Sequence, residues 1–225
     1  MKSNNNMRTV NISSPVTDKV VSNLNQGDIV FITGKIYTAR ESIYKKVLDD
    51  KESLPIDLPS ISNINFHCSP AASYEVGKGF NVGAVTATAS FRFDKWMPDW
   101  FSYSKAKLII GKGGMSENTY KKTFLPAGAK YLTTVGYGTG ALLGRGIKNT
   151  LDAIWIKELG IAQALWIFDV EDFGPFIVDT GDDGSSLFDK SNQHVNHRLK
   201  ALYKDLKKPT LSRYGETTSR EDEII

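Results

Sequence analysis

The feature that most constrains the fold of this chain is a set of short apolar runs that end in glycine. They are "GDIVFITG" (27–34), "AKLIIG" (106–111) and "KYLTTVG" (130–136). Runs of this length, rich in β-branched residues and bounded by turn residues, are typical of buried strands. The chain has 225 residues, which is enough for one large domain or two small ones with a proper core.

Segments with helical periodicity separate these runs. In "RESIYKKVLDD" (40–50), Ile43 with Val47 and Tyr44 with Leu48 are spaced four residues apart. Strands that alternate with helices indicate an α/β domain. In such domains ligands gather at the carboxyl ends of the strands, where glycine lets the backbone approach closely.

The rest of the chain adds further elements. "FNVGAVTATASFRFD" (80–94) predicts a strand that leads into a loop, whereas 55–72 is rich in Pro, Ser and Asn and predicts extended or irregular structure. "QALWIFDV" (163–170) and "PFIVDTGDDG" (175–184) predict two further strands. Four apolar residues at 4-3-4 spacing predict an amphipathic helix as the last structured element: Val195, Leu199, Leu202 and Leu206.

We predict one folded domain over residues 10–208, between flexible tails at 1–9 and 209–225. Both tails are polar and lack periodicity. The first ten residues do not resemble a signal peptide, and no apolar run reaches the ~18 residues of a membrane span. These patterns predict a cytoplasmic protein that does not enter the membrane.

Charge and cysteine content limit the partners. The formal charge of +3 is too small to indicate a nucleic-acid-binding protein, but it is compatible with a small anionic ligand. Cys68 is the single cysteine. A chain with one cysteine cannot form an internal disulfide framework, or a metal or iron–sulfur site built from several of its own thiolates.

Cations close to strand ends form the first candidate site. Arg40 follows the first predicted strand, Arg92 lies four residues after Thr88, and Lys112 stands between glycines. An arginine fork pairs with a carboxylate through two parallel hydrogen bonds, and lysine adds a point charge. Around one pocket these groups would suit a dicarboxylate or a phosphate. Taken one at a time, each is instead typical of a solvated surface charge.

The glycine-rich segments give a second candidate, a nucleotide site. "GYGTGALLG" (136–144) is not a G-x-G-x-x-G fingerprint, and in "GKGGMS" (111–116) the lysine precedes the glycines instead of closing a P-loop. A nucleotide-binding α/β protein that uses "GYGTG" therefore stays as a weaker hypothesis. Tight turns after strands explain most of these glycines.

Other polar residues carry weaker signals. His194 and His197 have a metal-binding spacing on the predicted last helix, but no third ligand is near in the sequence, which favours an exposed helix face. His67 is either a site residue or a hydrogen-bonded loop histidine. Glu171 and Asp172 have the chemistry of a general base, yet their position favours an exposed strand end.

A resemblance adds to this interpretation. The chain resembles the β subunits of L(+)-tartrate dehydratase and two-subunit class I fumarases, and the C-terminal domain of single-chain class I fumarases. The likeness runs from about Gly27 to Phe188. It is carried by a series of motifs in the family's order: "GDIVFITGKIYTARES", "HCSP", "TATASFRFD", "LIIGKGGM", "KELGIAQALWIFDVEDFGP" and "DDGSSLF".

The resemblance implies a fold, a reaction and a partner. The fold is an α/β swivelling β/β/α domain with a mixed sheet. The reaction is the reversible dehydration of a 2-hydroxydicarboxylate, either malate to fumarate or L-tartrate to oxaloacetate. The family's [4Fe-4S] cluster acts as a Lewis acid on the departing hydroxyl. It belongs to an α subunit, so the resemblance implies an α partner and an α2β2 assembly.

The resemblance also assigns roles to four residues. Thr88 matches the family's proposed base, which takes the proton from the carbon next to a carboxylate. Arg92 completes the same motif, Lys112 matches the carboxylate-binding lysine of I-G-K-G, and Arg40 matches a substrate arginine after the first strand. These are the residues that the strand-end cations and the nearby hydroxyl had already singled out.

The chain departs from the family pattern close to Thr88. Thr86 and Ala87 replace a Gly-Pro pair, and Ala89 replaces a second threonine. Further departures are Glu41, Tyr44 and Ser69. Losing Gly-Pro changes the backbone freedom of this segment. The departures favour an alternative hypothesis, a diverged module that binds a dicarboxylate or a partner without chemistry.

Overall fold

The computed structural model describes residues 7–136, 138–202, 204, 211–213 and 216–217. The chain divides into two compact units, Met1–Phe188 and Asp189–Ile225. The first unit is an α/β structure with a mixed sheet, as the sequence predicted. No helix in the described part of the chain is long and apolar enough to cross a membrane.

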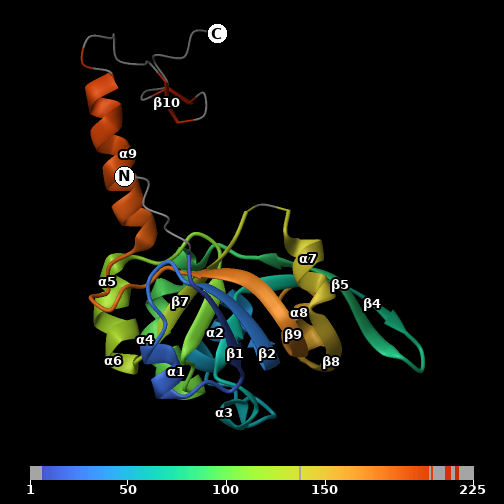
Figure 1. The fold of residues 1–225 in the computed structure, drawn as a ribbon. Helices are drawn as coiled ribbons and strands as arrows, with labels where there is room; N and C mark the ends of the chain where they lie inside the picture. The colour runs from blue at the N-terminus through green and yellow to red at the C-terminus, as the bar shows by residue number, and fades with distance from the viewer. Residues whose placement is uncertain (1–6, 137, 203, 205–210, 214–215, 218–225) are drawn as a thin grey trace. The chain divides into compact units, whose positions relative to one another are not determined.

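The central element of the first unit is a seven-stranded sheet (Figure 1). In spatial order its strands are β1 (Thr9–Ser13), β2 (Ile29–Thr38), β3 (Ile64–Phe66), β6 (Leu108–Gly111), β7 (Lys130–Thr134), β9 (Leu165–Val178) and β8 (Ile147–Ile154). Strands β1, β2, β3, β6 and β7 are parallel neighbours, and β9 runs antiparallel to β7 and β8. Strand β9 also pairs with β2, which closes β2, β3, β6, β7 and β9 into a ring.

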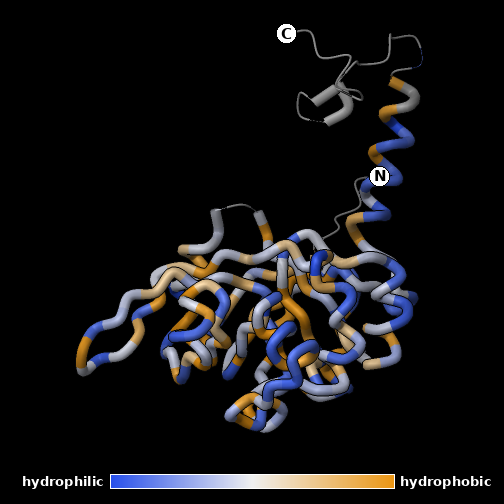
Figure 2. The backbone as a smooth tube through the Cα atoms, turned by 180° about the vertical axis from the view of Figure 1, so that it is seen from behind, coloured by the Kyte–Doolittle hydropathy of each residue, from blue (hydrophilic) through white to orange (hydrophobic). Residues whose placement is uncertain are grey.

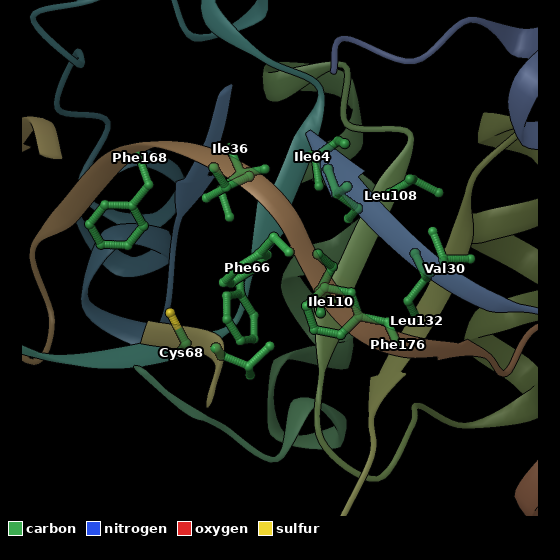
Figure 3. Close-up of a cluster of buried hydrophobic side chains, with 14 of the residues drawn as sticks. Val30, Ile36, Ile64, Phe66, Cys68, Leu108, Ile110, Leu132, Phe168 and Phe176 are labelled. Atoms are coloured by element: carbon green, nitrogen blue, oxygen red, sulfur yellow. The ribbon is translucent and has the colours of Figure 1, made fainter. Parts of the chain in front are cut away.

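Side chains that alternate along the strands fill the inside of this ring. Successive side chains of a strand point to opposite faces, so every second residue faces the interior. Ten residues of this inner core are labelled in Figure 3: Val30, Ile36, Ile64, Phe66, Cys68, Leu108, Ile110, Leu132, Phe168 and Phe176. In Figure 2 the most hydrophobic segments likewise lie in the middle of the first unit.

A second, aromatic core covers the outer face of the ring. Residues with the opposite alternation, such as Tyr37, Ile109 and Tyr131, pack there against helices. The Tyr44 ring lies 4.8 Å from the Trp100 ring and 5.5 Å from the Phe93 ring, both edge-on. Both faces of the strands are therefore buried, which explains why the strands are continuous apolar runs.

The segments of this outer layer are short. Glu41–Tyr44 (α2) continues into the π-helical turn Lys45–Asp49 (η1), and the 3-10 helix Ser90–Trp96 (η2) continues into Met97–Ser104 (α4). The remaining helices of the first unit are α1 (Asp18–Ser22), α3 (Leu58–Ile61), α5 (Glu117–Thr119), η3 (Tyr120–Phe124), α6 (Leu125–Ala127), α7 (Gly140–Arg145) and α8 (Ile156–Leu159).

A hairpin projects from the carboxyl end of β3 (Figure 1). Its strands β4 (Cys68–Glu75) and β5 (Gly79–Ala87) are antiparallel and pair Cys68 with Ala87 at the base. The chain therefore leaves the ring after His67 and returns to it at Thr88. The loop expected after this strand is the short 3-10 helix η2.

One prediction about strands is corrected by the structure, and another is made more specific. The two strands expected at 163–170 and 175–184 are one strand, β9, which pairs along its length with β8, β2 and β7. The segment 55–72, expected to be extended or irregular, contains the central strand β3 and also the short helix α3. Strand β3 is only three residues long, and Asn65 in its middle hides the apolar signal.

The second unit contains helix α9 and a small sheet. Helix α9 (Leu187–Leu202) begins within the first unit, and Val195, Leu199 and Leu202 on it are exposed, while Leu206 lies outside the described residues. The strands β10 (Leu211–Arg213) and β11 (Glu216–Thr217) form an antiparallel pair within 209–225. The rest of that range, and residues 1–6, lie outside the described residues.

Candidate active site

The carboxyl ends of parallel strands bring three of the four predicted site residues to one edge of the sheet. Arg40 lies two residues after β2, Lys112 directly follows β6, and β3 lies between these strands. Neighbouring strands are ~4.8 Å apart, so the backbones of β2 and β6 are separated by about 10 Å. Thr88, which follows the hairpin, joins the same edge.

Backbone hydrogen bonds hold Thr88 beside Lys112. The Thr88 N–H donates to the His67 carbonyl (2.7 Å), and the Lys112 N–H donates to the Thr88 carbonyl (3.0 Å). The Ser90 N–H then donates to the Lys112 carbonyl (3.3 Å). The segment 88–90 thus takes the place of β3 as the neighbour of β6, and the spacing between Thr88 and Lys112 is fixed by the main chain.

Gly111 makes this close approach possible. A Cβ atom at this position would lie 2.0 Å from Ser90 Oγ, 2.6 Å from Tyr131 Oη and 3.3 Å from the Thr88 carbonyl oxygen. Any side chain would therefore collide with the segment that carries Thr88. The glycine before Lys112 is needed for packing at the site and not for an unusual backbone conformation.

Thr88 is the buried member of the site. The residue is only 7% exposed. Its hydroxyl makes no hydrogen bond to the residues that the structure describes, so the group is available to a ligand. Residue Arg92, four positions later in helix η2, is exposed, and its guanidinium lies 5.4 Å from the Phe93 ring centre.

Arg40 is half-buried and poorly satisfied. Its Nη1 donates to the Ala162 carbonyl (2.8 Å), whereas its buried Nε has no partner among the described residues. Burial lowers the pKa of the Arg40 guanidinium, Cys68 opposes this, and the positive charge of Arg92 lowers it further. The two guanidinium groups thus repel each other, and an anion bound between them would relieve that repulsion.

Lys112 borders a small hollow. The hollow measures ≈170 Å³ and is lined by the end of strand β5, Lys112 and the segment after β7: Val85, Thr86, Ala87, Lys112, Thr134, Gly136, Gly138, Thr139 and Gly140. Lys112 is half-buried and makes no ion pair with any described residue. Its ammonium and the threonine hydroxyls suit an oxyanion or another polar group of a ligand.

The loop that carries Lys112 is anchored from behind. The Met115 N–H donates to Tyr120 Oη (3.0 Å), and the Tyr120 hydroxyl donates to the Asp179 carboxylate. Asp179 also accepts the backbone N–H groups of Leu187 and Phe188. Burial raises the pKa of Asp179 although these hydrogen bonds oppose the effect. This anchor could not be predicted from the sequence, because Asp179 and Tyr120 are far apart in the chain.

The other sequence candidates do not form a second reactive centre. Glu171 is exposed and paired with Lys148, whose hydrogen bond and positive charge lower the pKa of Glu171 and make it a poor base. His194 and His197 are exposed on α9. The described residues contain no group of three His, Cys, Asp or Glu side chains that could hold a metal.

Two glycines of "GYGTGALLG", Gly140 and Gly144, have a packing role. At Gly144 a Cβ atom would lie 2.4 Å from the Gly83 carbonyl oxygen, and at Gly140 it would lie 3.0 Å from that of Val85. These glycines let helix α7 pack closely on strand β5. The structure therefore favours packing over a nucleotide fingerprint for these residues.

Known proteins are similar in sequence to this chain over most of its length. A family model described as "Fumarase C-terminus" matches residues 1–191. The "Putative L(+)-tartrate dehydratase subunit beta" of Methanocaldococcus jannaschii is 33% identical over 190 residues, which cover 83% of this chain and 95% of that protein. The "L(+)-tartrate dehydratase subunit beta" of Escherichia coli K12 is 23% identical over 203 residues, covering 87% and 94%.

A longer protein matches in only part of its length. The "Putative fumarate hydratase class I" of Geobacillus stearothermophilus is 29% identical over 180 residues. The match covers 80% of this chain and 34% of that protein. The matched region therefore makes up nearly the whole chain of two of these relatives and a segment of a longer chain in the third.

Proposed function

The chain belongs to the fumarase C-terminus family, and from this premise we propose that it is the β subunit of a hydro-lyase. The reaction would be the reversible removal of water from a 2-hydroxydicarboxylate, either malate to fumarate or L-tartrate to oxaloacetate. The names of the relatives support this choice, since two are tartrate dehydratase β subunits and one is a class I fumarate hydratase.

The observation that carries the proposal is the group of cations without carboxylate partners. Arg40, Arg92 and Lys112 make no ion pair with described residues, although eight ion pairs occur elsewhere in the described part of the chain. Arg40 and Arg92 lie close enough to repel each other, and neighbouring cations without an ion-pair partner are typical of sites for polyanionic ligands. A dicarboxylate supplies the missing charge.

Each residue has a role in this scheme. Arg40, Arg92 and Lys112 would bind the two carboxylates and orient the carbon that loses its proton. Thr88 Oγ, as the alkoxide, would accept that proton while the hydroxyl on the neighbouring carbon leaves as hydroxide. Transfer of the same proton from Thr88 to the hydroxide would then complete the water and restore the base. A threonine hydroxyl is a weak base, and burial disfavours its anionic form further, so the adjacent cations are what would have to stabilise that form.

The iron centre expected from the resemblance does not fit this chain alone. Cys68 is its single cysteine, and this side chain lies in the inner core, where burial raises the pKa of the thiol. We therefore assign a [4Fe-4S] cluster to an α subunit. When bound there, it would supply Lewis acidity to the departing hydroxyl.

The open position of the cations supports a partner chain as well. Arg92 is exposed and Arg40 is half-exposed, whereas electrostatic interactions with a substrate strengthen when bulk water is expelled from a closed site. We propose that the unit acts as a swivelling β/β/α domain, which closes this edge over the α subunit within an α2β2 assembly. Closure would desolvate the cations together with the substrate.

Anaerobic co-expression with an α subunit of the same family tests the proposal. We expect fumarate hydration or L-tartrate dehydration that needs both chains, and a strong loss of turnover in R92A and K112A. His194→Ala, at an exposed position on α9, serves as the control that keeps wild-type turnover. Equal turnover by the α subunit alone and by the pair would refute the proposal.

A second candidate function is dicarboxylate or partner binding without chemistry. It is favoured by the Thr88 hydroxyl, which has no described hydrogen-bond partner to activate it, and by Thr86 and Ala87 before it. Calorimetry separates the two functions. Fumarate binding to the chain, combined with no turnover alongside any α subunit, would favour the binding module.

A further inference from the structure

Directly behind Thr88 lies a chain of buried polar side chains. Five side chains, each 0% exposed, are joined in it: Asn65, Tyr44, His67, Ser90 and Tyr131. Asn65 Nδ2 donates to Tyr44 Oη (2.8 Å), which lies 2.7 Å from His67 Nε2. His67 Nδ1 lies 2.7 Å from Ser90 Oγ, and the Tyr131 hydroxyl donates to Ser90 Oγ (2.8 Å).

His67 is the member that joins the two halves of this chain. Burial, and then the charge of Arg40, lower the pKa of His67 to about 3, so the imidazole is neutral at physiological pH. A neutral imidazole has one donor and one acceptor nitrogen. Tyr44 and Ser90 each carry a hydroxyl that can donate or accept, so they can satisfy both nitrogens. Removing the imidazole would leave buried hydroxyls unpaired.

Ser90 transmits this arrangement to the site. Its Oγ lies 3.5 Å from the Thr88 carbonyl oxygen, the same atom that accepts the Lys112 N–H. Gly111 leaves no free space at this junction, because a Cβ there would overlap Ser90 Oγ and Tyr131 Oη. A shift of Ser90 would therefore displace the backbone of Thr88 relative to Lys112.

We propose that His67 is a positioning residue, which bridges Tyr44 to Ser90 and so holds the segment 88–90 in register with Lys112. Its importance for turnover rests on the proposed hydro-lyase function. His67 touches the backbone and the Ser90 hydroxyl but not the Thr88 hydroxyl, so it would act on the reaction only through the placement of Thr88.

Two conservative variants of His67 test whether its contact with Ser90, and not its contact with Tyr44, holds the segment 88–90 in place. In His67→Asn the side-chain amide can reach the position of Nδ1 and restore the contact with Ser90. In His67→Gln it can reach the position of Nε2 and restore only the contact with Tyr44. Both variants lose one buried hydrogen bond, so we expect them to have similar melting temperatures.

Catalysis should distinguish the two variants. A misplacement of ~1 Å can reduce a rate by about 10²-fold, so we expect kcat of the αβ enzyme to fall about that much in H67Q and S90A. In H67N it should stay within about tenfold of the wild type. The KM for fumarate should change little in all three, because the cations remain. Equal kcat values for H67N and H67Q would overturn the proposal.

Hydrogen exchange tests the same placement without catalysis. The Lys112 amide, bonded to the Thr88 carbonyl, should lose protection in the full-length H67Q and S90A chains and keep it in H67N. Ser62→Ala is the matched control, since Ser62 is also fully buried and hydrogen-bonded but lies before β3. Unchanged Lys112 protection in H67Q and S90A would also overturn the proposal.

The two measurements separate the two proposals. If the wild-type αβ enzyme converts neither fumarate nor L-tartrate, the proposed function fails, and the exchange result alone decides the role of His67. If turnover is present but does not follow the contact with Ser90, the positioning role fails and the proposed function stands.

Discussion

The two edges of the sheet carry similar cations in different surroundings. At the amino edge, Lys107 lies directly before β6 and Lys130 opens β7, and each is paired with a carboxylate, that of Asp18 or Asp182. At the carboxyl edge, Arg40 and Lys112 follow strands of the same ring and make no ion pair with described residues. The protein pairs Lys107 and Lys130 with carboxylates at one edge and leaves Arg40 and Lys112 without an ion-pair partner among the described residues at the other.

The pKa directions agree with this difference. At the amino edge, burial would raise the pKa of Asp28, but hydrogen bonds from Arg8 and the Asn25 N–H, with the charges of Arg8 and Lys130, lower it. At the carboxyl edge, burial and Arg92 lower the pKa of Arg40, opposed by Cys68 and Glu41. At the first edge the charge of Asp28 is favoured in the folded chain, whereas at the second the charge of Arg40 is disfavoured by burial and by Arg92.

The largest effect should follow from removing a cation at the carboxyl edge. In Lys112→Met the loss of a charged hydrogen bond to the substrate should cost about 2–4 kcal/mol, or roughly 30- to 10³-fold in kcat/KM. Lys107→Met is the matched change at the amino edge, where turnover should stay near wild type. Steady-state kinetics of the αβ enzyme measure both, and similar losses would abolish the distinction between the edges.

Gly111→Ala should have the next largest effect, on stability. Its Cβ would overlap Ser90 Oγ and Tyr131 Oη, and overpacking of this kind costs about 1–3 kcal/mol. Gly83→Ala is the matched control, because a Cβ there meets nothing within 4 Å. Urea unfolding of both variants checks the prediction, and equal midpoints would show that the junction at Ser90 yields to a methyl group.

Asp28→Asn probes the amino edge through pH. Because the pKa of Asp28 is lowered in the folded state, its stabilisation is present above the unfolded-state value of about 4 and is lost as the pH falls through the folded-state value. At pH 7 the variant should melt about 2–5 °C lower, with a gap that closes in acid. Thermal melts between neutral and acidic pH measure this gap.

The control for that change is Asp18→Asn. Asp18 pairs with Lys107, but its side chain is 82% exposed, and exposed ion pairs contribute little to stability. Its melting temperature should stay at the wild-type value over the whole pH range. A decrease in melting temperature as large as that of D28N would mean that the burial of a carboxylate at this edge does not determine how much it stabilises the folded chain.

The smallest effect on stability is expected at Arg40. Since burial disfavours its charge, Arg40→Met should melt at the wild-type temperature or slightly above it. Fumarate should raise the melting temperature of the wild type by mass action but that of the variant much less. Arg145→Met, at an exposed position after the glycine-rich loop, should keep the wild-type response. A clear loss of stability in R40M would show that the Arg40 charge stabilises the fold, as expected for the paired cations of the amino edge.

The sequence was sufficient where chemistry follows directly from a strand. Arg40 and Lys112 stand just after apolar runs that end in polar residues or glycine, so the carboxyl-edge rule for α/β sheets located both. The His67 network could not be found in this way. Its members come from α2, β3, η2 and β7, and only tertiary packing shows that Tyr44, Ser90 and Tyr131 meet around one imidazole.

The errors in the fold prediction have a related cause. The Gly174–Pro175 pair is a typical break between elements. Strand β9 continues through it because β2 pairs with residues before and after the pair, and β7 pairs with the residues after it. The three residues of β3 are too few to show periodicity, but they lie between β2 and β6 at the centre of the sheet. Pairing between distant segments decided both cases.

The closure of the ring by β9 has a consequence for how the chain folds during synthesis. Ile29 pairs with Ile177, so β2 obtains this neighbour only after the whole segment from β3 to β9 has been made. Contacts of such long range are slow to form, because much chain entropy is lost first. Until β9 emerges from the ribosome, the apolar interior of the unfinished ring stays exposed to chaperones and to other nascent chains.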